Sequence, residues 1–408
     1  MYGVLKTYYV ILIYSIFGQY IFNVPDIVSD VLVVGFIALS LCQDRYQLHV
    51  PRKLGNYCLS IIIVPAIVIL AFSLTSQLFQ SLSTDYLVRS TTLCVRWVLY
   101  CVLGLRTVYV FGEKSADMLL VSCLVAYIPT IVIYFVQNGI VAGFNILFSS
   151  DAYSESIVLE VHRMTYVFGF LSVYYLYKWI ISKDRVLPQM LLSIVLLLLG
   201  VKRIANFALI LILAFLLLIK FLKNDERRYR FTCVLAVITV LIPLLYVFAI
   251  KSGGLRLAFE HFGIEDSFRF NFWNHISSEY EFSVGFLGKG ISYSQRFMWN
   301  EWSNIKDLSA ATNLHNDILS YYIGLGFIGF VGFFGLFFVG QTVLLKRWFS
   351  VKSALFAFAL SSYYFVIMAT SNEGLPGFVY GCYMMLIFAV ASSEDEALSY
   401  SDRRKANE

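Results

Sequence analysis

Charged residues are scarce in this chain. Asp, Glu, Lys and Arg together make up 14% of its 408 residues, whereas hydrophobic residues make up 59% and aromatic residues 17%. Water-soluble domains carry about 25% charged and roughly 45–50% apolar residues. The composition therefore excludes a soluble globular domain and indicates a chain that is largely surrounded by lipid.

Cysteines are also few, and their arrangement argues against two kinds of site. They lie within or beside apolar segments, at Cys42, Cys58, Cys94, Cys101, Cys123, Cys233 and Cys382. Their number is odd and no CxxC spacing occurs, so neither a disulfide framework nor a zinc site is predicted. We also expect no cleavable signal peptide, because the first apolar segment runs into the turn at 23–26 without a small-residue cleavage pattern.

Long apolar segments recur along the whole chain. A helix that crosses the hydrocarbon core of a bilayer needs about 20 apolar residues. Twelve segments approach this length, at 7–22, 27–42, 56–74, 86–105, 117–136, 164–181, 187–201, 204–222, 231–250, 316–340, 353–371 and 377–392. The sequence therefore predicts an all-α polytopic membrane protein with twelve transmembrane helices.

Basic residues are distributed unevenly over the connections between these segments. With the N-terminus in the cytoplasm, the two termini and the connections on that side collect 20 of the 31 basic residues. Cytoplasmic loops carry an excess of Lys and Arg. We therefore expect both termini in the cytoplasm, and His315, after the ninth segment, on the outer side.

The predicted organisation is one transmembrane domain at 1–392, followed by a cytoplasmic tail at 393–408. The domain includes an outer loop at 251–311 that carries three of the six tryptophans, Trp273, Trp299 and Trp302. A loop of this length is usually functional. Within it, apolar residues recur every four positions over 266–282, which predicts a helix capped by Asp266 or Ser267.

A polar cluster precedes the tenth apolar segment. We expect Thr312 or Asn313 to cap this helix and to place His315 in its first turn. The positive end of a helix disfavours an imidazolium, so one interpretation is a neutral imidazole that accepts a proton. The other interpretation is that His315 only anchors the helix at the membrane interface.

Glycines recur at every third position of the same segment, at Gly326, Gly329, Gly332 and Gly335. Small residues at such a spacing allow helices to approach closely in lipid. We expect this ridge to pack against neighbouring spans and thereby hold His315 rigidly.

Several cations are expected at or near the outer face. Lys202 and Arg203 lie between the seventh and eighth segments, where they either reach lipid headgroups or bind an anion. The planar fork of arginine suits phosphate oxygens. Arg269 shares a helix face with Trp273, four residues away, and either pairs with a neighbouring carboxylate or binds a sugar diphosphate.

Three further arginines are weaker candidates. Arg89 and Arg96 are seven residues apart in the fourth segment, so they share a face and are expected to point into the bundle, since lipid-facing arginines are costly. Arg163 opens the sixth segment from the outer side. The outer carboxylates form no compact metal-ligand pattern, so no metal is predicted.

Taken in chain order, these motifs resemble the O-antigen polymerase and O-antigen ligase superfamily of bacterial inner membranes. The resemblance rests on Arg203 at the start of a span, the stretch Arg269–Trp273 followed by Gly288–Gly290, and Leu314–Leu319 leading into a glycine-rich span. It covers about a third of the chain, roughly 200–335. Lys202 departs from the family pattern, in which a small hydroxyl residue is expected before the arginine.

The resemblance implies a membrane glycosyltransferase with GT-C-like architecture that uses undecaprenyl-diphosphate-linked oligosaccharide donors at the periplasmic face. It implies that His315 activates the acceptor hydroxyl and that Arg203 and Arg269, with Lys202, hold the diphosphate. Asn316, Trp273, Arg163, Arg89 and Arg96 are expected as further substrate contacts. The implied partners are membrane lipids, a chain-length regulator and a flippase, with no cofactor and no nucleic acid.

Three functions stay open at this point. A polymerase that joins repeat units is preferred, because the first half of the chain is very aromatic and agrees with the family only in topology. A ligase that transfers the polysaccharide to lipid A core shares the donor and the same motifs. A transporter of lipid-linked sugars is the third, although such proteins usually show internal repeats and ionisable residues near the bilayer midplane.

Overall fold

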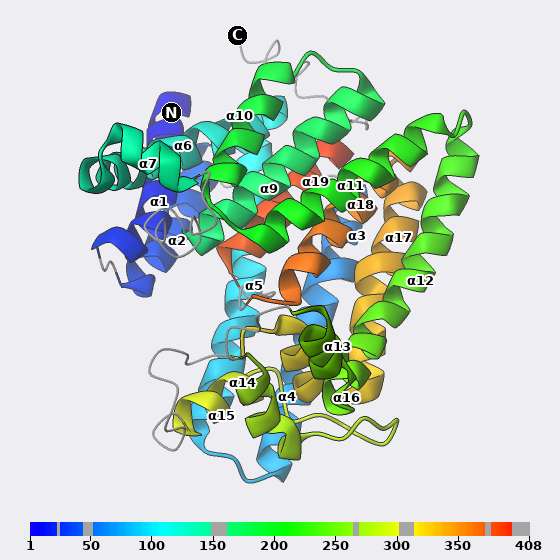
Figure 1. Cartoon of the computed structure of the whole chain (residues 1–408). Coiled ribbons are helices and arrows are strands. Elements are labelled where there is room, and N and C mark those ends of the chain that lie inside the picture. Colours follow the sequence, from blue (N-terminus) through cyan, green and yellow to red (C-terminus); the bar gives the residue numbers. More distant parts are fainter. Residues whose placement is uncertain are drawn as a thin grey trace.

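The computed structural model of the chain describes residues 1–22, 25–43, 52–147, 161–263, 269–301, 314–371 and 377–393. All regular structure in these ranges is helical, which confirms the predicted all-α class. The longer helices in Figure 1 are α1 (Tyr2–Phe22), α2 (Asp26–Gln43), α4 (Val64–Phe79), α5 (Thr84–Phe111), α6 (Ser115–Asn138), α9 (His162–Tyr177), α10 (Leu187–Leu199), α11 (Arg203–Phe221), α12 (Asp225–Lys251), α16 (Asp317–Gly335), α18 (Val351–Met368) and α19 (Phe378–Ser393).

Shorter elements complete the described fold. They are the α-helices α3 (Arg52–Cys58), α7 (Ile140–Leu147), α13 (Gly254–Phe262), α14 (Arg269–His275), α15 (Tyr293–Glu301) and α17 (Gln341–Trp348), and the π- or 3₁₀-helical turns η1 (Leu59–Ile63), η2 (Gly112–Lys114), η4 (Lys178–Ser182), η5 (Ile276–Glu279) and η7 (Leu336–Gly340). The predicted loop helix at 266–282 is thus α14 followed by η5. Its expected caps and the predicted tail from residue 394 onward lie outside the described residues.

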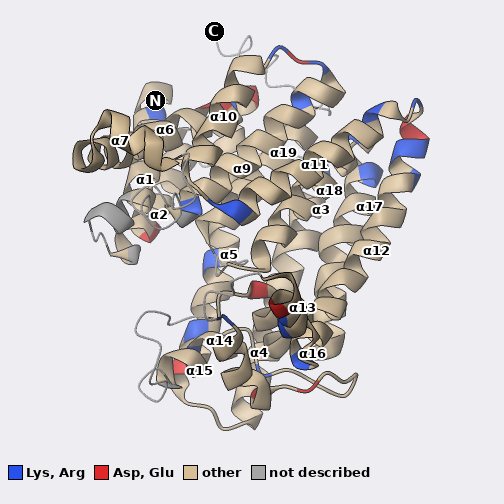
Figure 2. Ribbon diagram, in the orientation of Figure 1, with Lys and Arg blue, Asp and Glu red and all other residues tan. Residues whose placement is uncertain are grey.

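Length and apolarity support a membrane-embedded protein. Six helical stretches among the described residues are long and apolar enough to cross a membrane, namely Arg52–Phe79, Thr84–Asn138, Arg203–Phe221, Asp225–Lys251, Asp317–Trp348 and Val351–Met368. One of these, Thr84–Asn138, contains both α5 and α6. Figure 2 shows α12 without charged residues along its middle. The count of twelve spans stays a prediction.

Helix α19 forms the centre of the bundle. Every residue from Phe378 to Ala391 is buried, and α5, α6, α9 and α18 pack around it. Two glycines allow α5 and α19 to approach closely, because a Cβ on Gly104 would lie 2.7 Å from the carbonyl oxygen of Gly381. Close backbone approach through small residues is therefore found between these two helices.

The loop helices gather at one end of the molecule. Figure 1 shows α13, α14 and α15 in the lower part, beside α4, α16 and the first half of α5. The described part of the predicted outer loop, 251–263 and 269–301, is thus a folded layer, the loop layer, at one end of the helix bundle. Lys251, at the end of α12, fixes part of this layer by donating hydrogen bonds to the carbonyl oxygens of Ser277 and Tyr280, at 2.5 and 2.9 Å.

The tenth predicted span is broken. Gly326 has φ 69° and ψ −179°, which is not helical and favours glycine. The rings of Tyr321 and Phe333 are 5.0 Å apart, although twelve residues of continuous helix would rise about 18 Å. The chain therefore bends sharply at Gly326. It leaves a short segment, Asp317–Leu325, that is too short to span a bilayer.

The expectation that the glycine ridge packs against neighbouring helices is wrong. Among the described residues, no atom outside the helix's own backbone lies within 4 Å of a Cβ built on Gly332 or Gly335. A Cβ on Gly326 would instead clash with the backbone of Leu287, and one on Gly288 would clash with the backbone nitrogen of Gly326. Gly326 and Gly288 instead allow the loop backbone to lie directly against the backbone of the broken helix.

The loop backbone completes the hydrogen bonding of α16 at this break. Helix ends leave unpaired amides and carbonyls that need other partners. Lys289 N donates to Ile323 O, Gly290 N to Gly324 O, and Phe327 N to Phe286 O, each at 2.9 Å. The Gly288–Gly290 turn is thus a structural partner of α16.

A buried polar network fastens the same loop to α4 and α5. Gln77 Nε2 donates to Ser90 Oγ and to Ser292 Oγ, both at 3.0 Å, and Ser292 Oγ donates to Tyr86 O at 2.9 Å. Gln77, Ser90 and Ser292 are all fully buried. Buried polar groups are costly unless they are hydrogen-bonded, so this network holds the loop in one register.

Candidate functional site

The start of α16 is organised by Asn316. Its Oδ1 accepts a hydrogen bond from Leu319 N at 3.0 Å, which makes Asn316 the N-cap. Its Nδ2 donates to the hydroxyl of Tyr246 at 3.2 Å, and the side chain is fully buried. The expectation of a cap at Thr312 or Asn313 is therefore wrong. Both polar ends of the Asn316 side chain are thus bonded within the protein, and its predicted contact with substrate stays a prediction.

His315 precedes this cap instead of lying in the first helical turn. Its φ is 48°, a left-handed conformation that costs roughly 1–2 kcal/mol for a residue with a side chain. The neighbours on both sides are fixed, since Asn316 caps α16 and Leu314 O accepts a hydrogen bond from Trp273 Nε1 at 3.0 Å. The imidazole is half-buried. The left-handed backbone of His315 thus lies between two hydrogen-bonded neighbours, an arrangement in which such strain can persist.

Helix α14 supplies Arg269 and Trp273 to the same place. Trp273 is 3% exposed and packs against Tyr246, with ring centroids 6.4 Å apart. The indole is therefore enclosed by protein in this structure, and the predicted contact of Trp273 with substrate stays a prediction. Arg269 is half-buried and lies close enough to Tyr246 to interact with it electrostatically.

Sequence reasoning missed Tyr246, which joins these groups. Its hydroxyl donates to Ala369 O at 2.9 Å and accepts from Asn316 Nδ2. It lies in the apolar stretch of α12 and belongs to no motif, so the single tyrosine gave no signal beyond its polarity. Nearby, Ser371 Oγ donates to Asp317 Oδ2 at 3.1 Å, and both residues are buried. Four separate segments therefore meet around His315.

A second group of candidate residues lies where α2, α5 and α9 meet. Arg96 Nη2 forms an ion pair with Asp30 Oδ2 at 2.6 Å, and the Tyr100 hydroxyl donates to Asp30 Oδ1 at 3.1 Å. Arg163 interacts electrostatically with Tyr100. The expectation that Arg96 points into the bundle agrees with this pairing.

Lys202 and Arg203 form the turn between α10 and α11. Arg203 is the first residue of α11 and is exposed. The ammonium of Lys202 lies 6.0 Å from the ring of Tyr166 on α9, at the outer limit of a cation–π contact. This contact places Lys202 beside the start of α9, at the same end as Arg163.

The residues around His315 and the group of Arg96, Asp30 and Tyr100 lie at opposite ends of the connection between α18 and α19. Ala369 and Ser371, at the end of α18, contact the residues around His315. Phe378, at the start of α19, packs its ring against Tyr100, with centroids 6.2 Å apart. Both groups therefore lie at the same end of the bundle.

Arg89 has a different surrounding from the other candidates. Its Nε donates to Gln295 Oε1 at 2.9 Å and so links α5 to α15. Of the remaining tryptophans, Trp299 on α15 is 59% exposed, and Trp302 lies outside the described residues. Arg89 thus contributes to holding the loop layer on α5.

A charged contact within the loop layer adds to this hold. Glu279 Oε2 accepts hydrogen bonds from Lys289 Nζ at 2.6 Å and from the Tyr293 hydroxyl at 2.5 Å. Partial burial raises the pKa of Glu279, but these two hydrogen bonds outweigh it and leave the pKa below its usual value. The carboxylate is therefore stabilised in its charged form and ties η5 to the Gly288–Gly290 turn.

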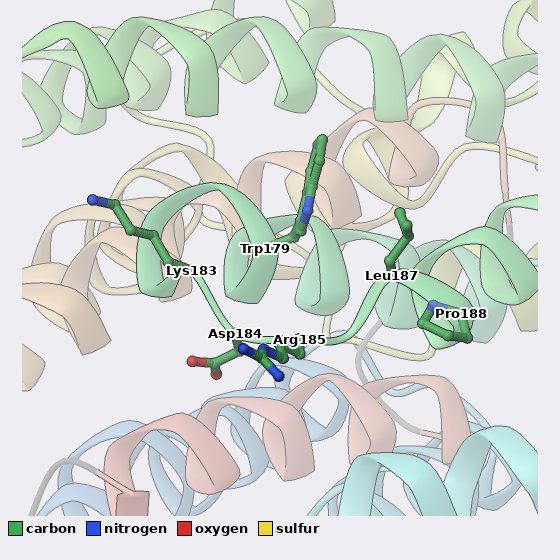
Figure 3. Close-up of a pocket in the computed structure, with 6 residues that line it drawn as sticks. All are labelled: Trp179, Lys183, Asp184, Arg185, Leu187 and Pro188. Atoms are coloured by element: carbon green, nitrogen blue, oxygen red, sulfur yellow. The ribbon is translucent and has the colours of Figure 1, made fainter.

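An open pocket lies at the other end of α9, away from these groups. Figure 3 shows Trp179 and Leu187 extending to one side of the turn between η4 and α10, with Asp184 and Arg185 on the other side. Lys178 forms an ion pair with Asp184 at 3.1 Å. None of the residues predicted to bind substrate lines this pocket.

No family model matches the sequence, and no curated protein matches it.

Proposed function

We propose that this protein is a membrane glycosyltransferase that joins undecaprenyl-diphosphate-linked repeat units into a surface polysaccharide, as O-antigen polymerases do. The observation that carries the proposal is the grouping at the start of α16, where Asn316, next to His315, bonds to Tyr246, and Arg269 lies near Tyr246. This grouping combines a side chain that can accept a proton with a cation that can bind a diphosphate.

In the proposed reaction an acceptor hydroxyl attacks the anomeric carbon of the donor sugar. The glycosidic C–O bond forms as the bond between that carbon and the diphosphate oxygen breaks, and the diphosphate leaves with the bonding electron pair. The hydroxyl proton passes to the imidazole of His315, which acts as general base. Fixed positive charge from Arg269 stabilises the charge that develops on the leaving diphosphate.

The strained backbone of His315 supports the assignment of the general base. Such strain is found where the surrounding structure determines a side chain's position, and it clusters at functional sites. Lys202 and Arg203 are proposed to bind the diphosphate because of their positive charge and their order in the chain. The site is proposed to face the periplasm, with the protein in the bacterial inner membrane.

The experiment that tests the proposal is a lipopolysaccharide gel from the source bacterium after deletion of this gene. A core that bears a single repeat unit, with the longer ladder lost, is the result expected of a polymerase. A bare core, with polymer retained on its lipid carrier, would indicate the ligase reaction. An unchanged ladder would show that the substrate is not O-antigen.

A further inference from the structure

The hairpin between η5 and α15 carries exposed aliphatic side chains at its tip. Val284 is 65% exposed and Leu287 is 73% exposed, although they lie in a loop that also contains the exposed Glu281. In Figure 1 this yellow-green segment extends away from the other loop elements at the lower right. Single exposed aliphatic residues are common, but exposed apolar side chains that form a contiguous patch mark a contact with an apolar partner.

The hairpin is held rigidly at its base. Ser283 O accepts a hydrogen bond from Phe286 N at 3.1 Å, which closes the turn at its tip. Phe282 and Phe286 both stack on Tyr322 of α16, with ring centroids 5.8 and 5.5 Å apart. Together with the backbone pairing at Gly326, these contacts fix the orientation of the tip.

Two helices next to the hairpin expose apolar surface of the same kind. Phe282 packs against Phe248 of α12, which is itself 52% exposed. Leu287 abuts Gly326, two residues from Ile328, which is 67% exposed on α16. Both α12 and α16 belong to stretches long and apolar enough to cross a membrane. The aliphatic tip therefore continues the surface that these helices present to lipid.

We infer that Val284 and Leu287 insert into the acyl-chain region of the adjacent bilayer leaflet and dock the loop layer on the membrane. The occupant follows from the continuity with α12 and α16 and from the aliphatic chemistry of the tip. Glu281, at the foot of the hairpin, is the charged residue that faces headgroups or water.

Insertion of the tip would fix the position of the loop layer, and with it the start of α16, relative to the membrane. The same hairpin that contacts the leaflet pairs with α16 at Gly326, nine residues after Asp317 and the candidate site at its start. Membrane contact at the tip would thus hold the loop layer at a fixed height above the lipid. The inference rests on membrane embedding and is independent of the proposed reaction.

The test uses benzoylphenylalanine, a photoreactive residue, placed at Leu287 or, as a control, at Glu281. Each purified full-length variant is reconstituted into vesicles of phosphatidylethanolamine and phosphatidylglycerol, irradiated and analysed by mass spectrometry. Both sites are exposed, so neither substitution disturbs packing. We expect phospholipid adducts at position 287 in several-fold excess over position 281.

Equal yields at the two sites, or no lipid adduct at 287, would overturn the inference. Thermal unfolding of each variant identifies any that has failed to fold. If a photoreactive variant does not fold, fluorescence quenching of a tryptophan at the same position tests the inference instead. Leu287→Trp fluorescence should be quenched by phospholipids brominated along the acyl chain, and Glu281→Trp fluorescence should not.

Discussion

His315 is the residue on which the proposed chemistry depends. Replacing it with alanine removes the proton acceptor, and general-base catalysis usually contributes about 10²–10⁴-fold. We therefore expect His315→Ala to reduce glycosyl transfer from a lipid-linked donor by at least that factor, measured with purified protein. His261, exposed on α13, provides the matched control, and His261→Ala should keep wild-type activity.

A transport measurement on the same variant separates an enzyme from a transporter. His315→Ala should abolish glycosyl transfer without blocking the movement of lipid-linked sugar across the vesicle membrane. Wild-type protein that moves this lipid across vesicles but never joins two units would contradict the proposed reaction.

The arginine fork of Arg269 is the second residue-scale test. Arg269→Lys keeps the charge but loses the planar pair of donors that suits phosphate oxygens. Since hydrogen bonds to charged groups contribute about 1.5–3 kcal/mol, we expect transfer to fall about ten- to a hundredfold. Arg256→Lys is the control, because Arg256 is exposed and bonded to Glu260 at 2.8 Å. Arg203→Lys should also impair activity, and wild-type turnover would remove Arg203 from the site.

At the scale of elements, the break in α16 depends on one glycine. Its φ and ψ are accessible essentially only to glycine, and a Cβ there would clash with the Leu287 backbone. We expect Gly326→Ala to lower the free energy of unfolding by about 1–3 kcal/mol or more. Thermal unfolding in detergent measures this as a lower Tm.

Gly332→Ala is the matched control for that substitution. This glycine lies in a helical part of α16, and among the described residues no neighbouring atom lies within 4 Å of its would-be Cβ. Alanine is favoured over glycine in helices by roughly 0.5–1 kcal/mol. The variant should therefore be as stable as wild type or slightly more stable. Equal losses of unfolding free energy in both variants would show that the bend at Gly326 does not require glycine.

At the scale of the whole molecule, the positive-inside pattern makes a prediction about orientation. An alkaline phosphatase fusion after Lys223, between α11 and α12, should be inactive because this turn is expected in the cytoplasm. A fusion after Gly263, in the loop layer beyond α12, should be active in the periplasm. The opposite pattern would place His315 on the cytoplasmic side and remove the basis for a periplasmic reaction.

Much of the element-level structure follows from apolar runs that are continuous along the chain. The predicted segment 204–222 is α11 at Arg203–Phe221, and 353–371 is α18 at Val351–Met368, within a few residues. The apolar run predicts a helix that begins at residue 231. The helix begins at Asp225, where the Asn224 side chain accepts a hydrogen bond from Glu226 N. A polar helical turn carries no apolar signal and is missed.

Sequence alone determined the all-α class, the lipid-facing composition and the candidate residues His315 and Arg269, because each is a local property of composition or motif. Only the tertiary structure decided what surrounds them. Tyr246 is 69 residues before His315 in the chain, and the Gly288–Gly290 turn meets Gly326 from another segment. The spacing of glycines cannot distinguish close helix packing from a helix break. In both cases a backbone from a distant part of the chain fills the space where a Cβ would be, and only the tertiary structure shows which backbone it is.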